Sequence, residues 1–367
     1  MSKLNEARLH INEIDRQVAD LFCERLEAAA QIAEYKKEHG MQIFDPEREA
    51  EVIRRGSERI EDELKRSYYV SFLQDTMKTS RAFQERLMQG MKVAYSGTEG
   101  AFAHIAATRL FPSARLLGYP SFEAAYRAVE EGACDAAVLP MENSYNGEVG
   151  DVTDLLFSGS LYVNTVTDLE ITQDLLGVKG ATLSDVREVV SHPQALGQCA
   201  QFIHENGLFE KQYANTALAA KYVAERGDIH TAAIASAEAA AVFGLDVLAR
   251  GINASRINTT RFAVLSRAAH RHAANEDGVC SILLFSVRNE AGALARAIEI
   301  IGRHGFNMRA LRSRPMKTLL WQYYFYVEAE GNLFTGEGEQ LLSELSSCCD
   351  KLKAVGTYIK KNGGCDA

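Results

Sequence analysis

Hydroxyl and guanidinium side chains stand directly before a buried-strand pattern in the segment NTTRFAVLS, residues 258–266. The apolar run from Phe262 to Leu265 predicts a strand, and Thr260 and Arg261 precede it without a turn-forming residue. Ligands of α/β proteins bind at strand ends. The segment therefore predicts either a ligand site or an ordinary polar lead-in to a strand.

Two other segments place polar side chains after a strand pattern. VLPMENSYNGEV (138–149) ends a strand near Pro140, and VVSHPQALGQC (189–199) ends one and opens a helix. The free N–H groups of a helix start suit an anion. For Ser144 and Thr259, a role in forming a turn explains the hydroxyl side chain as well as ligand binding does. The candidate ligand contacts of these segments are Asn143, Ser144, Ser191 and Gln198.

A further set of charged and amide side chains lies in the first 89 residues. Arg25 and Lys36 are eleven residues apart, which is about three helical turns, so they share one face. Arg8 points about a quarter turn away from that face. Solvated charge on a helical bundle is the alternative explanation for each residue. The complete set is Arg8, Arg25, Lys36, Asp45, Arg48, Glu49, Ser80 and Gln84.

Composition limits the classes of protein. The chain has 367 residues, enough for two or three domains, and a net charge of -9. This acidity argues against a nucleic-acid-binding protein. The sequence has no 18-residue apolar run and no signal-peptide pattern at its start, which predicts a cytoplasmic protein that does not enter a membrane. Seven scattered cysteines without a CxxC pair favour neither disulfides nor a metal site.

The first region, 1–89, is predicted to be entirely helical. A helix from Asn5 to about His39 would be roughly 50 Å long, and its apolar stripe is expected to pack against a second chain. Asp45 and Pro46 fit the N-cap and first position of the next helix. The third helix is expected from about Glu63 to Leu87.

The other two regions mix strands and helices. Residues 91–268 alternate between strand and helix patterns, which predicts an α/β domain with a largely parallel sheet. A polar linker follows at about 268–278. Residues 278–367 show the order strand, helix, strand, strand, helix, strand, which is typical of an α+β ferredoxin-like module.

The helical region resembles the all-helical chorismate mutase family along its whole length, in the residues Arg8, Arg25, Lys36, Asp45, Arg48, Glu49, Ser80 and Gln84. The resemblance implies an intertwined dimer in which Arg8 comes from the partner chain. It also implies that arginines bind the carboxylates of chorismate, that Lys36 and Gln84 donate to the breaking ether oxygen, and that Glu49 accepts from the substrate hydroxyl. The rearrangement is pericyclic and needs positioning of the substrate above all.

The central region is similar to the prephenate dehydratase family in VLPMENSYNGEV, SHPQALGQC and NTTRF. The resemblance implies a two-lobed fold like that of periplasmic binding proteins, with Thr260 assisting the departing hydroxyl and Arg261 binding a carboxylate. It places Asn143, Ser144, Ser191, Gln198 and Phe262 around prephenate. The loop YSGTEGAFAH departs from the family pattern with Thr98, Ala101 and Ala103, and Gln173 stands where the family often has histidine.

The last region resembles the regulatory ACT domain. Gly292, Ala293 and Leu294 match one family motif, and Ser313, Arg314 and Pro315 match the other, while Arg312 replaces the usual glutamate. The resemblance implies that L-phenylalanine binds near both motifs and inhibits the dehydratase.

Together these resemblances predict a bifunctional chorismate mutase/prephenate dehydratase with an ACT domain, acting in phenylalanine biosynthesis. The expected assembly is a homodimer or a higher oligomer, and the expected ligands are chorismate, prephenate and L-phenylalanine, with no cofactor and no metal. One alternative is a mutase fused to a catalytically weak sensor of aromatic acids, which the altered YSGTEGAFAH loop favours. Another is a first region that serves only as a dimerisation coiled coil.

Overall fold

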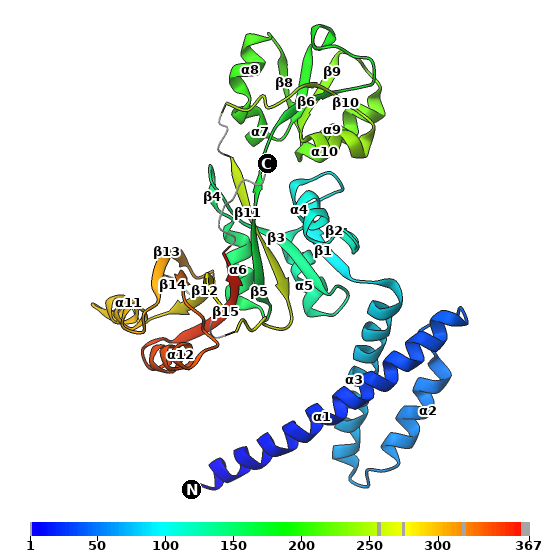
Figure 1. The fold of residues 1–367 in the computed structure, drawn as a ribbon, viewed down its shortest axis with the longest axis vertical. Helices are drawn as coiled ribbons and strands as arrows, with labels where there is room; N and C mark the ends of the chain where they lie inside the picture. Colours follow the sequence, from blue (N-terminus) through cyan, green and yellow to red (C-terminus); the bar gives the residue numbers. More distant parts are fainter. Residues whose placement is uncertain (1, 255–257, 274–275, 318–320, 361–367) are drawn as a thin grey trace. The chain divides into compact units, whose positions relative to one another are not determined.

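A computed structural model describes residues 2–254, 258–273, 276–317 and 321–360 of the chain (Figure 1). It divides into two compact units, Met1–Lys92 and Val93–Ala367. In the described part of the chain, no helix is both long enough and apolar enough to cross a bilayer.

The first unit consists of three helices, α1 (Lys3–Glu38), α2 (Pro46–Ser57) and α3 (Glu63–Gln89). The predicted N-cap of α2 is confirmed, because the Asp45 carboxylate accepts a hydrogen bond from the Arg48 backbone N–H at 3.0 Å and Pro46 occupies the first turn. Gly90 ends α3 with a φ of 83°, which suits a residue without a Cβ.

Only the second half of α1 packs within this unit. Ala29 and Ala33 are its buried residues, and α3 is the helix that it contacts. The first half of α1 leaves large apolar side chains exposed, as the sequence pattern predicts for a helix without an equally long partner. These side chains are Leu4, Leu9, Ile11, Ile14, Val18, Leu21 and Phe22.

The second unit contains a ten-stranded sheet, in the order β13-β14-β12-β15-β5-β11-β3-β1-β2 with β4 beside β3. Six of its strands and three helices form the first lobe of the dehydratase-like region. The chain leaves this lobe after β5 and returns to it in β11 (Figure 1). The elements are β1 (Lys92–Ser96), α4 (Phe102–Leu110), β2 (Arg115–Tyr119), α5 (Phe122–Glu130), β3 (Ala136–Asn143), β4 (Gly147–Glu148), α6 (Gly150–Ser158), β5 (Tyr162–Glu170) and β11 (Thr259–Ser266).

The second lobe is built on a separate five-stranded sheet in the order β10-β6-β9-β7-β8. Apolar clusters pack on both faces of this sheet. Its elements are β6 (Asp174–Gly177), the short 3₁₀ helix η1 (Leu183–Asp185), β7 (Glu188–Ser191), α7 (Pro193–Gln198), α8 (Ala200–Glu205), β8 (Phe209–Gln212), α9 (Thr216–Arg226), β9 (Thr231–Ala235), α10 (Ala237–Phe243) and β10 (Asp246–Ala249).

The prediction of a largely parallel sheet is only partly right. β1 and β3 are parallel, as are β7, β8 and β9. However, β11 is antiparallel to both β3 and β5, and β6 is antiparallel to β9 and β10. The reason is that the chain crosses to the second lobe after β5 and returns through β11, so these two strands must run in opposite directions.

The last region has the predicted ferredoxin-like order. It runs β12 (Val279–Ser286), α11 (Ala293–Arg303), β13 (Asn307–Pro315), β14 (Tyr323–Glu330), α12 (Gly336–Cys348) and β15 (Lys351–Ile359).

The module's β15 joins β5 of the first lobe through the pair Gly356 and Val163. A Cβ on Gly356 would lie 2.1 Å from the Val163 carbonyl oxygen, so glycine is required at this junction.

Candidate active sites

A cavity of about 420 Å³ lies between the two lobes of the second unit, and we call it the Thr260 cavity. Both lobes contribute to its wall, as expected for a ligand site in a two-lobed α/β fold. Its polar lining includes Asn143, Gln173, His192, Gln194, Gln198, Asn215, Asn258 and Thr260, and its apolar lining includes Ala101, Phe102, Ala103 and Phe262.

A chain of hydrogen-bonded amides ends on the Thr260 hydroxyl. The Asn258 Nδ2 donates to Gln198 Oε1 at 3.2 Å, and the Asn143 Nδ2 donates to Asn258 Oδ1 and to Thr260 Oγ1, both at 2.9 Å. Since β11 pairs with β3, Thr260 lies directly opposite Asn143. The sheet register therefore holds the two side chains together.

This arrangement occupies one lone pair of the Thr260 hydroxyl oxygen. Its oxygen accepts a hydrogen bond from Asn143, and within the described residues no acceptor is found for its proton. A hydroxyl whose oxygen is occupied can still donate its proton. Thr260 therefore offers a donor to a ligand in the cavity.

Arg261 lies on the opposite face of β11, because successive side chains of a strand alternate. It faces a small internal cavity together with Glu142, Arg312 and Glu328. Its guanidinium is 3.1 and 3.3 Å from the two Glu328 carboxylate oxygens. Arg261 is therefore not among the residues that line the Thr260 cavity.

The Arg261–Glu328 pair shifts the pKa of both groups. Burial is the largest single influence on Arg261 and opposes its charge, but the hydrogen bond to Glu328 and the attraction of Glu328, Tyr358 and Tyr326 together outweigh burial, so the pKa of the guanidinium is raised. For Glu328, burial is likewise outweighed by hydrogen bonds from Tyr358 and Arg261, so the pKa of its carboxyl is lowered. Both groups therefore stay charged, and they connect β11 to β14 and β15.

Two serines predicted to bind substrate have other partners. The Ser191 hydroxyl is fully buried and donates to the Ile234 carbonyl at 2.6 Å, which ties β7 to β9. The Ser144 hydroxyl accepts from the Thr259 backbone N–H at 3.0 Å. Neither residue is among those that line the Thr260 cavity, and the Ser144 contact joins β11 to the loop after β3, not the two ends of a local turn.

Sequence reasoning missed several contributors to the cavity, among them Asn258 and His192. Asn258 links Gln198 to Asn143, and its place at the start of NTTRF was the only available signal. His192 lines the cavity as the N-cap of α7. Gln173, noted in the sequence as a departure from the family's histidine, also lines the cavity where the chain crosses between the lobes. The altered loop does reach the cavity, through Ala101 and Ala103.

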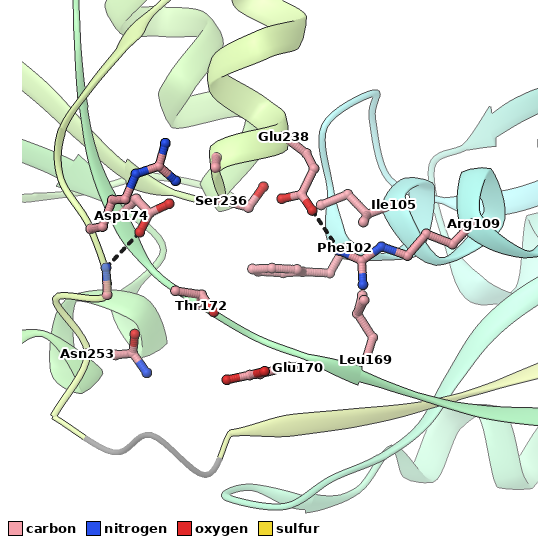
Figure 2. Close-up of a pocket in the computed structure, with 13 residues that line it drawn as sticks. Phe102, Ile105, Arg109, Leu169, Glu170, Thr172, Asp174, Ser236, Glu238 and Asn253 are labelled. Atoms are coloured by element: carbon pink, nitrogen blue, oxygen red, sulfur yellow. Dashed lines mark hydrogen bonds and ion pairs between the residues drawn. The ribbon is translucent and has the colours of Figure 1, made fainter. Parts of the chain in front are cut away.

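A second cavity, of about 570 Å³, faces the other side of the same crossing segment (Figure 2). Ile171 and Gln173 line the Thr260 cavity, whereas Thr172 and Asp174 line this one. The ion pair between Arg109 of α4 and Glu238 of α10, at 2.8 Å, spans the two lobes here. Asp174 accepts from the Gly251 N–H at 2.7 Å.

The helical unit brings some of its predicted site residues together. Arg25 of α1 donates to the Ser80 hydroxyl of α3. Gln84 lies one turn beyond Ser80 and is also buried. Its Oε1 has no hydrogen-bond partner among the described residues. An unpaired buried amide is costly, so the Gln84 position is suited to a ligand.

The other predicted residues of this unit are paired or exposed. Lys36 donates to the Ile43 carbonyl at 2.5 Å, and Glu49 pairs with Arg81. Arg48 is exposed and pairs with Glu51 at 2.5 Å. Arg8 lies on the exposed first half of α1, away from the buried Ser80 and Gln84.

The two predicted effector motifs lie at one end of the ferredoxin-like module. Ser286, which ends β12, pairs with Tyr324, and Tyr324 pairs with Arg314. Gly292 follows β12 and starts α11 with a φ of 84°. The Arg314 guanidinium is 3.1 Å from Asp154 of α6, so this side chain holds the module to the first lobe.

Arg312 also faces the first lobe. Its guanidinium lies 2.5 Å from Glu142 and over the ring of Tyr326. The glutamate that is usual in the family at this position would place its carboxylate beside that of Glu142 and repel it. Arg312 therefore replaces a repulsive contact with an attractive one.

Two separate clusters of buried polar side chains, one helical and one between α/β lobes, define a two-site enzyme. The sequence model of prephenate dehydratase matches residues 93–270, and that of type II chorismate mutase matches residues 7–85. The bifunctional chorismate mutase/prephenate dehydratase of Aquifex aeolicus is 30% identical over 98% of this chain and 99% of its own length. The chain belongs to this bifunctional family and carries both enzyme domains.

Other relatives cover the second unit. The chloroplastic arogenate dehydratase/prephenate dehydratase 1 of Arabidopsis thaliana is 31% identical over 73% of this chain and 72% of its own length. The solved prephenate dehydratase of Arthrobacter aurescens, in complex with L-Phe, has a TM-score of 0.67 and 25% identity, over 73% of this chain and 90% of its own. The solved structure of GqqA, described as a novel type of quorum quenching acylase, has a TM-score of 0.68 and 32% identity, over 74% of this chain and 98% of its own.

Proposed function

We propose that the helical unit converts chorismate to prephenate with the residues that the family resemblance assigns. Arg8, Arg25 and Arg48 would bind the two carboxylates, since a planar guanidinium suits a carboxylate. Lys36 and Gln84 would donate to the ether oxygen as its C–O bond breaks. The buried, unpaired amide of Gln84 is the observation that carries this assignment.

Ser80 and Asp45 have supporting roles in this proposal. The Ser80 hydroxyl orients Arg25, and Asp45 caps the helix that carries Arg48 and Glu49. The exposed apolar half of α1 supports a dimer in which this stripe packs against a second copy and Arg8 enters the partner's site. Arg25→Ala should then abolish chorismate turnover while dimers persist in sedimentation. A coiled coil without chemistry would have no turnover to lose.

We propose that the Thr260 cavity converts prephenate to phenylpyruvate. The bond from the ring to its carboxylate breaks, carbon dioxide leaves, and the electron pair completes the aromatic ring. The ring hydroxyl leaves as water after gaining a proton. The Thr260 oxygen accepts from Asn143, and its proton has no acceptor among the described residues, which supports a role for Thr260 at the departing oxygen. A threonine is too weak an acid to supply that proton alone, so its part is to donate a hydrogen bond.

A weak sensor of aromatic acids is the second candidate for this cavity. Its lining holds neither an arginine nor a lysine in the described part of the chain, and Ala101 and Ala103 line it with methyl groups. Carboxylates would therefore be held by amides such as that of Gln198, and by His192. A sensor would release prephenate unchanged.

We propose that the last module binds L-phenylalanine and lowers dehydratase activity. The motifs Gly292–Leu294 and Ser313–Pro315 lie at one end of its sheet. The similar dehydratase from Arthrobacter aurescens was solved with L-Phe. Inhibition requires that phenylalanine bind a less active arrangement more tightly.

One experiment tests these assignments together. The full chain is incubated with chorismate, quenched in alkali, and analysed for prephenate and phenylpyruvate with and without phenylalanine. Phenylpyruvate that decreases with phenylalanine supports all of them, and prephenate alone favours the sensor. Thr260→Ala should stop phenylpyruvate formation while chorismate is consumed at the normal rate. Loss of both activities would contradict separate sites.

A further inference from the structure

Gln173 is a buried amide that faces the Thr260 cavity without a protein partner for its oxygen. Its backbone is held where the chain crosses between the lobes: its N–H donates to Asn253 at 3.1 Å, and its carbonyl accepts from the Ile252 N–H at 2.8 Å. The side chain is 3% exposed and lines the cavity. Its Oε1 has no hydrogen-bond partner among the described residues.

The other amides in the core of this cavity differ from Gln173. Asn143 uses its nitrogen on Asn258 and Thr260 and its oxygen on the backbone N–H groups of Tyr145 and Asn146. The oxygens of Asn258 and Gln198 also accept hydrogen bonds. An unpaired buried amide oxygen is costly, and a ligand donor in the cavity would remove that cost.

The sheet register places Gln173 away from Thr260. Leu169 pairs with Thr260, and the ladder continues as the Ile171 N–H donates to the Asn258 carbonyl at 2.7 Å. Gln173 is four residues beyond Leu169 and past the end of β5 at Glu170, so the two lie at most about 13 Å apart along the chain. A substrate whose ring hydroxyl meets Thr260 would therefore direct its three-carbon side chain toward Gln173.

The chemistry of that end of the substrate decides what Gln173 can bind. In prephenate, the side chain ends in a ketone and a carboxylate, and both only accept hydrogen bonds. An amide oxygen needs a donor. The 2-amino counterpart, arogenate, carries an ammonium group in place of the ketone, and its N–H groups can donate to the Gln173 oxygen, while the amide nitrogen can donate to the adjacent carboxylate.

We propose that Gln173 is a specificity-determining residue and that the dehydratase site accepts L-arogenate as well as prephenate. This rests on the proposed dehydratase function. The bond changes are the same: the ring carboxylate leaves as carbon dioxide, its electron pair enters the ring, and the ring hydroxyl leaves as water with one added proton. The side chain is unchanged, so the product of arogenate is phenylalanine.

The test compares kcat/KM for L-arogenate and for prephenate in the full chain. Methionine is of similar length to glutamine but lacks the amide, so Gln173→Met should lower kcat/KM for arogenate about ten- to a hundredfold, as for a lost hydrogen bond to a charged group. Prephenate should be affected much less. Gln173→Glu should shift the ratio toward arogenate, because a carboxylate attracts ammonium and repels the prephenate side chain.

The ratio of the two kcat/KM values is independent of the fraction of enzyme that folds. Gln201→Met, at an exposed glutamine on α8 that pairs with Glu205, is the control and should leave the ratio unchanged. An equal loss for both substrates in Gln173→Met would mean that Gln173 binds water or only supports the fold, and would overturn the proposal. Turnover of prephenate without any turnover of arogenate by the unaltered chain would also overturn it.

Failure of the proposed dehydratase function gives a different result, since neither substrate would then be turned over. In that case, calorimetric titration of the unaltered chain and of Gln173→Met with each compound still decides the role of Gln173. Tighter binding of arogenate than of prephenate, lost in Gln173→Met, supports the role as a binding determinant. Equal affinities in both proteins refute it.

Discussion

Replacing Arg261 by methionine tests whether this residue belongs to the catalytic cavity or to the junction between β11 and the ferredoxin-like module. The substitution leaves the Glu328 carboxylate, which is 3% exposed, without its cation. Removal of one member of a buried ion pair costs about 3–5 kcal/mol. The hydroxyls of Tyr326 and Tyr358 still donate to Glu328, so we expect the lower end, about 3 kcal/mol.

The double variant Arg261→Met/Glu328→Gln separates stability from catalysis. It removes both charges, so its stability should return to within about 1 kcal/mol of the unaltered chain. Because Arg261 does not line the Thr260 cavity, the KM for prephenate should also be close to normal.

Urea unfolding of the full chain, followed by circular dichroism, measures the first effect. The transition of the helical unit should not shift and serves as an internal control, since Arg261 belongs to the other unit. Steady-state kinetics measures the second effect. A stable double variant with a KM raised tenfold or more would refute the structural role, because that loss corresponds to a missing carboxylate contact of about 1.4 kcal/mol or more.

Four other substitutions test contacts within the second unit. Gly356→Ala should destabilise this unit by more than about 2 kcal/mol in urea unfolding, because the new Cβ would meet the Val163 carbonyl and the φ of 150° suits only glycine. Gly302→Ala is the matched control: there is open space around its Cβ, so it should stabilise α11 by up to about 1 kcal/mol. Glu328→Gln should make the free energy of unfolding depend less steeply on pH in acid. The pKa of Glu328 is lowered in the folded chain, so its ion pair stabilises the fold above the ordinary carboxyl pKa, and this contribution is lost as the pH falls through the lowered pKa. Equal acid slopes for the variant and the unaltered chain would contradict this. Ser191→Ala should cost about 1–2 kcal/mol, because a buried carbonyl loses its donor, and an unchanged unfolding midpoint would argue against that bond.

The sequence predicted the elements that have strong periodicity or clear end signals. The long α1, the capped α2 and the order of the last module follow from apolar spacing, from Asp45 and Pro46, and from alternating strands. The short strands β2, β4, β6, β8 and β10 were not predicted, and segments such as GE of β4 and FEKQ of β8 lack the apolar run of a buried strand.

The sequence predicted which segments form the candidate site better than it predicted which of their residues line it. The segment NTTRF does reach the cavity, but its adjacent residues Thr260 and Arg261 lie on opposite faces of β11. Only the strand register shows which of the two faces the cavity. Ser191 was expected to bind a ligand because it ends a strand, yet its buried hydroxyl is used by Ile234. The sequence analysis had named both Gln84 and Gln173, but only the structure shows that their amide oxygens are buried without a hydrogen-bond partner among the described residues.

The alternation along β11 also explains how one strand can serve both the cavity and the ferredoxin-like module. Thr260 meets Asn143 on one face, and the next residue, Arg261, meets Glu328 of β14 and the Tyr358 hydroxyl of β15 on the other. Packed elements of this kind do not deform gradually. A ligand that favours a different position of β14 or β15 must therefore either break the Arg261 contacts or move β11, and moving β11 displaces Thr260 from Asn143.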